Sequence, residues 1–244
     1  MKAIILAAGY ATRMYPLTEN FPKPLLEVGG VSVIDRILEQ LKERGDVDSV
    51  YVVTNNKFYS KFLEWGGGKS VTVLNDGTLS NDDRLGAIGD LNFVLETEKI
   101  DDDIIVLAGD VILDKAVDEL LTTFKKDELP LISVKDMFDK EKLAGKYGVL
   151  ELDSENTIVG FEEKPENPKT SLKNNPFFIV PKKHLSLVKE FVSSGSNTDA
   201  PGNFVAWFCK KTKMKAVMTE GAYWDIGSIE TYKEADKQFS EAGK

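Results

Sequence analysis

The chain has 244 residues and a formal net charge of −9, and 42% of its residues are hydrophobic, which is ordinary for a globular protein. The acidic balance argues against a nucleic-acid partner, because such proteins normally carry a basic face. A single cysteine and a single histidine exclude an intrachain disulfide, a Cys-rich zinc site and a His-based metal cluster, and no apolar run is long enough to cross a membrane.

These exclusions restrict the chemistry. With one histidine and one cysteine, catalysis has to rest on carboxylates, lysine, arginine and backbone groups, together with a metal ion. The N-terminal run "MKAIILAAG" ends in a glycine loop instead of a signal-peptide cleavage site. We therefore expect it to form the first strand of a cytoplasmic protein with no membrane partner.

An apolar strand-like run at 3–8 is followed by a long irregular loop. In "LAAGYATRMYPLTENFPKPLL" (6–26), one glycine and three prolines interrupt any helix, and the loop carries two cations, Arg13 and Lys23. A glycine turn after a strand exposes backbone N–H groups to phosphate oxygens, and the cations add positive charge. The alternative is a surface loop with incidental cations, but loops of this length are usually functional or disordered. We interpret the stretch as a phosphate-binding loop.

Amphipathic helical stretches and apolar runs then alternate. The spacing predicts helices at 32–45, near 57–65, at 85–98 and at 115–126, and strands at 49–54, 70–75 and 103–110. This alternation indicates a parallel sheet with helices on both faces. Ligands bind at the carboxyl ends of the strands in such sheets, and both the opening loop and Asp110 lie at that edge.

After residue 128 the pattern becomes more antiparallel. We expect strands at 129–136, 146–153, 157–164 and 214–218, a polar loop at 166–176, and helices near 182–194, at 200–211 and at 228–242. There is no internal repeat and no low-complexity linker. We interpret residues 1–244 as one domain whose second half builds the other wall of a cleft.

The opening stretch, extended to "LAAGYATRMYPLTENFPKPLLEVGG", resembles the signature G-x-G-T-R-x-x-P-x-T-x-x-x-P-K-P-L-L of the sugar-phosphate nucleotidylyltransferases. This group includes glucose-1-phosphate thymidylyltransferases and their uridylyl, cytidylyl and guanylyl relatives. The sequence departs from the signature at Ala11, where the pattern has its second glycine. Further segments resemble the family over most of the chain: "RLGAIGDL" (84–91), "AGDVIL" (108–113), "KYGVLELD" (146–153), "GFEEKP" (160–165) and "YWDIGSIETY" (223–232).

The resemblance implies a Rossmann-like α/β fold with a doubly wound, mostly parallel but mixed sheet. Residues 1–128 would form its nucleotide-binding half and 129–244 its acceptor-binding half. The enzyme would join a nucleoside triphosphate to a sugar 1-phosphate, release pyrophosphate and form a nucleoside diphosphate sugar. The implied nucleotide-binding residues are Leu6, Ala8, Gly9, Ala11, Thr12, Arg13, Asn75 and Gly86. The implied acceptor-binding residues are Gly148, Glu163, Lys164 and Asn175.

The same resemblance assigns catalytic roles to three cations. Arg13 would engage the leaving β- and γ-phosphates, Lys23 would orient the α-phosphate or the attacking phosphate, and Lys164 would hold the phosphate of the acceptor. Asp110 and Asp225 would bind one Mg²⁺, which characteristically takes one or two carboxylates plus substrate phosphate. Taken alone, an aspartate at a strand end could equally be a turn residue or a helix cap.

Several points stay open at this level. Pro176 and Phe177 stand where the family usually has small residues, so the identity of the acceptor stays open. It is either a sugar 1-phosphate or a non-sugar phosphate, such as phosphocholine or a polyol phosphate. In the second case the enzyme would be a cytidylyltransferase. A non-catalytic nucleotide-binding domain is a further alternative, although Arg13, Lys23 and both aspartates are present. A dinucleotide-dependent oxidoreductase is disfavoured because "GYATRM" lacks a full G-x-G-x-x-G. The base, the pathway and any homo-oligomer are undetermined.

Overall fold

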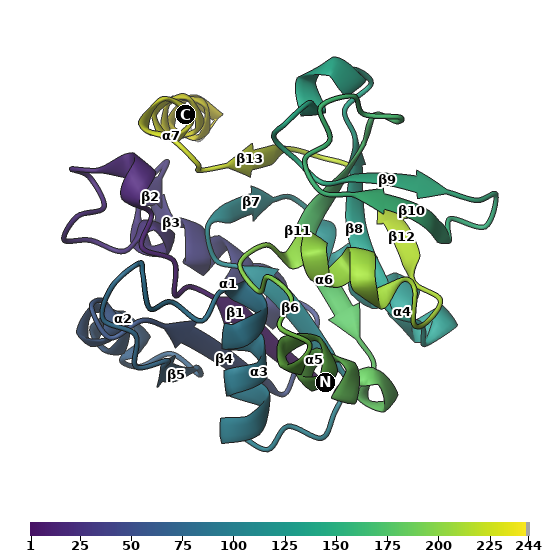
Figure 1. The fold of residues 1–244 in the computed structure, drawn as a ribbon. Helices are drawn as coiled ribbons and strands as arrows, with labels where there is room; N and C mark the ends of the chain where they lie inside the picture. The colour runs from purple at the N-terminus through teal and green to yellow at the C-terminus, as the bar shows by residue number, and fades with distance from the viewer. Residues whose placement is uncertain (243–244) are drawn as a thin grey trace.

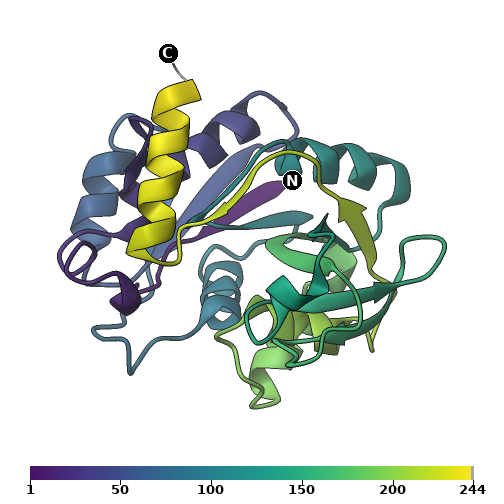
Figure 2. The ribbon, with the colours of Figure 1, turned by 90° about the horizontal axis from the view of Figure 1, so that it is seen from above.

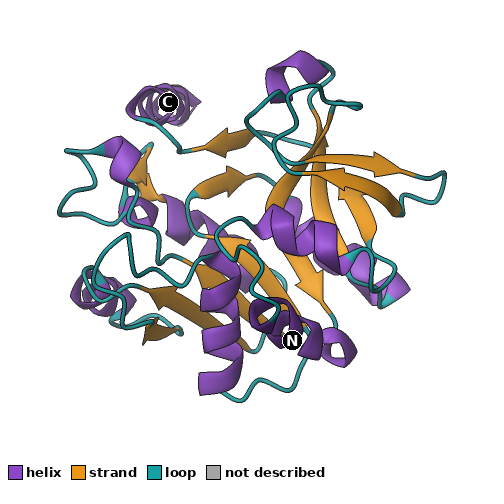
Figure 3. Cartoon of the chain, in the orientation of Figure 1, coloured by secondary structure: helices purple, strands orange, loops and turns teal. Residues whose placement is uncertain are grey.

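The structure, a computed structural model, describes residues 1–242 and contains one mixed sheet flanked by helices (Figures 1 and 3). The strands of this sheet are β1 (Lys2–Leu6), β4 (Ser49–Thr54), β5 (Thr72–Asn75), β6 (Ile104–Ala108), β8 (Leu131–Asp136), β9 (Val149–Leu152), β10 (Ile158–Glu162), β11 (Leu172–Val180) and β12 (Lys215–Met218). Their order is β10-β9-β11-β6-β1-β4-β5, and β8 pairs with both β11 and β12.

The helices cover both faces of this sheet. They are α1 (Val33–Lys42), α2 (Tyr59–Gly66), α3 (Ala87–Thr97), α4 (Ala116–Asp127), α5 (Ser186–Ser193), α6 (Pro201–Phe208) and α7 (Ile229–Ala242), with short 3₁₀ helices η1 (Thr12–Met14), η2 (Lys23–Leu25), η3 (Lys140–Leu143) and η4 (Lys182–His184). Alternate residues of β1 face opposite sides: Ile5 packs with α1, α2 and α4, whereas Ile4 packs with α3, α5 and α6. The predicted fold class, a doubly wound α/β fold with a mixed sheet, is confirmed.

The parallel part of the sheet creates the edge at which the opening loop and Asp110 meet. β1 pairs in parallel with β4 on one side and with β6 on the other, so that Leu6 lies beside both Val53 and Ala108. The three carboxyl ends therefore open at one edge. The opening loop and Asp110 both leave the sheet there, as the alternation of helices and strands predicted.

The second half is antiparallel around β11, and here one expectation was wrong. Residues 166–176 were expected to form a loop, but β11 begins at Leu172 and runs for nine residues. On one side β11 pairs with β8 in both its first and its last part, with an irregularity between Asn174 and Phe178. On the other side its first part pairs with β9 and its last part with β6. The strand thus joins the two halves into one continuous sheet.

Two small sheets, which the sequence patterns did not predict, complete the fold. One pairs β7 (Val111–Leu113) with β13 (Tyr223–Asp225), and the other pairs β2 (Glu27–Val28) with β3 (Val31–Ser32). Figure 2 shows the C-terminal helix α7, in yellow, lying over the N-terminal part of the chain. Within residues 1–242, no helix combines the length and the hydropathy that crossing a membrane requires.

Candidate active site

A cleft of about 500 Å³ lies at the carboxyl edge of the parallel strands, between the opening loop and the second half. Its lining includes most of the residues predicted for the site: Leu6, Ala8, Gly9, Ala11, Thr12, Arg13, Lys23, Gly86, Asp110, Gly148, Glu163 and Asp225. They come from segments spread over more than 200 residues. The topology therefore gathers into one cavity the groups that the motifs singled out, while their roles in binding and catalysis stay predictions.

Hydrogen bonds from side chains to backbone carbonyls hold the opening loop at the rim of this cleft. The Asn55 side chain donates to the carbonyl of Ala8 at 2.8 Å, and the Thr18 hydroxyl donates to the carbonyl of Ala11 at 2.8 Å. A Cβ added at Gly9 would meet nothing within 4 Å, so the backbone there faces open space. Ala11 has φ 48° and ψ 40°, a left-handed conformation that suits the glycine of the family signature better than alanine.

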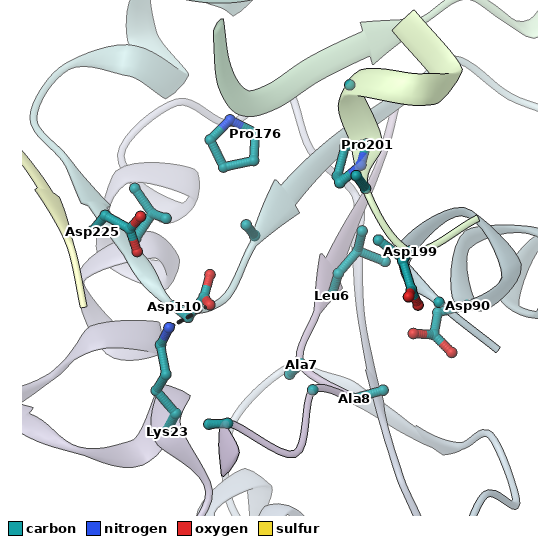
Figure 4. Close-up of a pocket in the computed structure, with 18 of the residues that line it drawn as sticks. Leu6, Ala7, Ala8, Lys23, Asp90, Asp110, Pro176, Asp199, Pro201 and Asp225 are labelled. Carbon is teal, nitrogen blue, oxygen red and sulfur yellow. Dashed lines mark ion pairs between the residues drawn. The ribbon is translucent and has the colours of Figure 1, made fainter. Parts of the chain in front are cut away.

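The two aspartates predicted to bind metal lie together at one end of the cleft (Figure 4). Asp110 follows β6, and its Oδ2 lies 2.7 Å from the Nζ of Lys23, which is almost entirely buried. Asp225 ends β13, whose antiparallel pairing with β7 sets it opposite Val111. Burial, followed by the negative charge of Asp110, raises the pKa of the Asp225 carboxyl. A cation placed between the two carboxylates would relieve this repulsion.

The donor set at this end can be compared with what a divalent cation needs. No group of three or more histidine, cysteine, aspartate or glutamate side chains with metal-binding geometry occurs among residues 1–242. Two carboxylates alone fit Mg²⁺, which keeps water and substrate phosphate in its remaining positions. They do not fit a structural zinc site, which takes four protein ligands.

The opposite wall comes from the antiparallel half. Gly148 precedes β9, and a Cβ at this position would collide with the side chains of Asn174 and Phe161. A Cβ at Gly202, in the first turn of α6, would collide with the carboxylate of Glu163. Burial raises the pKa of this Glu163 carboxyl, which faces the cleft. The two glycines therefore leave room for a carboxylate that can accept hydrogen bonds from a ligand.

Three predicted residues lie elsewhere. Asn75 donates to the Asn56 side chain at 2.8 Å and accepts from the backbone of Gly77 at 2.9 Å, so it organises a turn and does not line the cleft. Asn175 is fully buried and donates to the hydroxyl of Ser133 at 2.9 Å. Lys164 is 56% exposed, lies 4.0 Å from Glu163 and is not part of the lining.

The structure also adds lining residues that the sequence analysis did not name as site residues. Asn174 and Pro176 line the cleft in place of Asn175 and Phe177, because alternate residues of β11 point to opposite faces. Phe177 is fully buried in the core, so it does not narrow the acceptor side. A third group lies at the far end of the cleft and includes Asn81, Arg84, Asp90 and Asp199. Arg84 and Asp90 belong to the segment 84–91, which by resemblance was expected to approach the base and ribose, but the helical spacing of 85–98 alone did not show that Asp90 faces a cavity.

Comparison with known proteins gives a consistent picture. A family model described as "Nucleotidyl transferase" matches residues 2–242. Two curated relatives, both called "Bifunctional protein GlmU", come from Methanocaldococcus jannaschii, at 28% identity over 97% of this chain, and Methanococcus aeolicus, at 26% identity over 93%. These alignments cover 54% and 51% of the relatives, so the chain spans about half their length.

Solved structures show the same fold. A putative glucose-1-phosphate thymidylyltransferase from Bacillus anthracis, in complex with sucrose, superposes with a TM-score of 0.83 at 23% identity and covers 99% of this chain and 96% of its own. A UDP-glucose pyrophosphorylase complexed with UDP-glucose gives a TM-score of 0.81 at 18% identity, with 99% and 98% covered. At these identities the likeness concerns the fold.

Proposed function

Because this chain belongs to the nucleotidyl transferase family, we propose that it joins a nucleoside triphosphate to a sugar 1-phosphate and releases pyrophosphate. The observation that carries the proposal is the convergence of Lys23, Asp110 and Asp225 in one cleft beneath the loop that carries Arg13. The names of the structural neighbours, which concern glucose 1-phosphate and UDP-glucose, support a sugar phosphate as the acceptor.

In the proposed reaction an oxygen of the monoester phosphate attacks the α-phosphorus of the triphosphate. A new P–O bond forms, the bond from the α-phosphorus to the bridging oxygen breaks, and that oxygen leaves with its electron pair as part of pyrophosphate. Several negative charges meet in one cleft, so catalysis consists mainly of positioning and neutralisation. This chemistry needs no histidine or cysteine, which agrees with a lining that contains neither.

The residues of the chain divide this work. Arg13, exposed on the opening loop, is free to approach the leaving phosphates, and Arg forms bidentate hydrogen bonds with them. Lys23 is held in place by Asp110 and supplies a fixed positive charge beside the reacting phosphate. Asp110 and Asp225 would hold Mg²⁺, which neutralises phosphate charge when bound. Glu163 would accept hydrogen bonds from acceptor hydroxyls.

The test is a pyrophosphate-release assay with a panel of triphosphates and sugar 1-phosphates, with Mg²⁺ and with EDTA. We expect release with at least one pair and none with EDTA. Asp110→Asn should lower turnover by on the order of a hundredfold or more. The matched control, Asp114→Asn, changes an exposed aspartate just beyond β7 and should keep wild-type turnover. Wild-type turnover in Asp110→Asn would contradict the metal assignment, and no release with any pair would contradict the function.

A further inference from the structure

The end of the cleft away from Lys23 carries acidic groups that phosphate chemistry does not use. In Figure 4, Asp90 and Asp199 lie close together beside Ala8, whereas Lys23, Asp110 and Asp225 lie on the other side. Lys23 and Arg13 both lie near Asp225, and a cation held by Asp110 and Asp225 would add positive charge there, so we place the triphosphate at that end. A nucleotide placed in this way directs its base toward the acidic end, because the acceptor occupies the wall near Glu163.

Asp90 is the most unusual of these groups. It lies in the first turns of α3, its side chain lines the cleft, and it is only 6% exposed. Its buried Oδ1 has no hydrogen-bond donor among the described residues. A buried polar atom without a partner is costly, so the Oδ1 of Asp90 needs a proton shared with a neighbouring group, which leaves the other carboxyl oxygen to face the cleft.

A second carboxyl lies behind Asp90. The Oδ1 of Asp76 accepts from the backbone N–H of Thr78 at 2.7 Å and from its hydroxyl at 2.8 Å, whereas its Oδ2 is buried without a partner in the described part of the chain. Burial, followed by the charge of Asp76 and a hydrogen bond to it, raises the pKa of Asp90 to about 8. One proton carried by Asp90 can satisfy both carboxyls, and the remaining oxygen of Asp90 is then an acceptor at the cleft.

The surrounding charges favour hydrogen-bond donors at this position. Asp199 adds negative charge near Asp90. Arg84, a cation in this group, is already engaged in hydrogen bonds. Its Nε and Nη2 donate to the carboxylate of Asp199 at 2.9 and 2.5 Å, and its Nη1 donates to the carbonyl of Asn81. Tyr10 is also engaged, because its hydroxyl is bonded to Thr78 at 3.1 Å.

We propose that Asp90, backed by Asp76, recognises an exocyclic amino group of the nucleobase, so that the chain uses an amino-bearing base (cytosine, guanine or adenine) in preference to uracil or thymine. An amino group projects from the ring and offers two N–H donors to an acceptor. Uracil and thymine carry their single N–H between two carbonyl oxygens, which an acceptor in an acidic site repels. This assignment rests on the proposed function, since it takes the cleft to be a nucleotide site.

The test measures binding of CTP, GTP, ATP, UTP and dTTP by calorimetry with Mg²⁺, separately from turnover. The wild type should bind at least one amino-bearing triphosphate about tenfold or more tightly than UTP and dTTP, since a site built around a hydrogen bond rejects ligands that lack it. Asp90→Ala should reduce this preference to within a fewfold. Asp90→Asn should keep it, because the amide can donate to Asp76 and still present a carbonyl oxygen to the cleft.

The control is Glu96→Ala, which removes an exposed acid from the same helix, where it pairs with Lys189, and should leave the preference unchanged. A wild-type preference for UTP or dTTP, or an unchanged preference in Asp90→Ala, would overturn the proposal. A base preference in binding without pyrophosphate release would overturn the proposed reaction and leave the base assignment standing. If no triphosphate binds, both are wrong.

Discussion

Lys173 is a primary amine buried in the second half, close to the candidate active site. It is fully buried, its Nζ has no hydrogen-bond partner among the described residues, and it lies 2.8 Å from the ring centre of Tyr223 and 4.7 Å from that of Tyr147. Burial lowers its pKa to about 6, with Asp225 opposing the shift. At neutral pH the amine is therefore mostly uncharged, and the unfolded chain binds a proton that the folded chain does not.

This proton difference fixes the sign of a pH effect on stability. Between pH 10.5 and 6 the unfolded state binds more protons at this site, so the contribution of Lys173 to folding becomes less favourable as the pH falls, and it is constant below pH 6. Lys173→Met should therefore stabilise the protein relative to wild type by a margin that grows by roughly 1 kcal/mol per pH unit from pH 9 to 7. Urea unfolding at pH 7, 8 and 9 in EDTA measures this margin. If the free energies of unfolding of the two proteins changed with pH in parallel, the lowered pKa of Lys173 would be contradicted.

The site residues differ in how well the sequence could predict them. Arg13 and Lys23 lie in short 3₁₀ helices of the segment that follows β1, and Asp110 lies directly beyond β6, so pattern and position coincide for these three. Asn175 was predicted and Asn174 was found, because neighbouring strand residues point to opposite faces and a one-residue shift reverses every side chain. Asp90 lies in the segment 84–91 that resembles the family, but helical spacing does not show which of its side chains face a cavity, and the packed structure does.

Among the elements, β11 shows why the expected loop at 166–176 is partly a strand. After Leu172 the strand continues with three polar residues (173–175) and then Pro176, which cannot donate to a sheet ladder. The proline lies where β11 exchanges β9 for β6 on one side and where its pairing with β8 is irregular on the other, and Pro176 has no paired residue in any of these ladders. The strands β7 and β13 are three residues each and form only because more than 100 residues of intervening chain bring them together.

Helix α6 gives a prediction at the same scale, because its first turn forms part of the acceptor wall. Gly202 has an ordinary backbone conformation, but an added Cβ would displace the carboxylate of Glu163. Gly202→Ala should therefore raise the KM for the acceptor about tenfold or more and change the KM for the triphosphate little. Steady-state kinetics with each substrate varied in turn separates the two values.

The control for this variant is Ala206→Gly, on the same helix and outside the cleft lining. It should weaken the helix by about 1 kcal/mol and leave both KM values unchanged. Equal rises in the two KM values for Gly202→Ala would indicate general damage to the cleft and contradict a specific role for this wall.

At the scale of the whole molecule, local periodicity predicted the alternation of strands and helices and thus the parallel half. It could not predict how the end of the chain returns to the beginning. Helix α7 packs on the hairpin of β2 and β3: Asp236 accepts from the backbone N–H of Gly29 at 2.8 Å, and the hydroxyl of Tyr232 donates to the carbonyl of Glu27 at 3.0 Å. Each of these contacts joins a side chain of α7 to a backbone group more than 200 residues earlier in the sequence.

This packing connects stability to the active site, because α7 follows β13 and Asp225 within a few residues. Phe239 lies against the backbone at Gly29, and the Arg36 guanidinium lies 4.4 Å from its ring centre. Phe239→Ala keeps the Cβ and backbone atoms at Gly29 but removes the ring, and with it the contacts with Arg36 and with the apolar cluster beneath α7. It should lower the free energy of unfolding by about 2 kcal/mol, less than for a fully buried ring because this one is half-buried. Because the anchor of Asp225 loosens, kcat should also fall severalfold.

Urea unfolding and pyrophosphate release measure the two effects on the same preparation. Lys237→Ala, an exposed change on the same helix, should alter neither. Reduced stability with wild-type kcat would mean that the pairing of β13 with β7 is enough to position Asp225. Helix α7 would then contribute only to folding. Unchanged stability would mean that the contact between the two ends of the chain adds nothing to the fold. A joint fall in both quantities is expected, because the helix that fastens the hairpin also fixes the direction in which β13 enters the cleft.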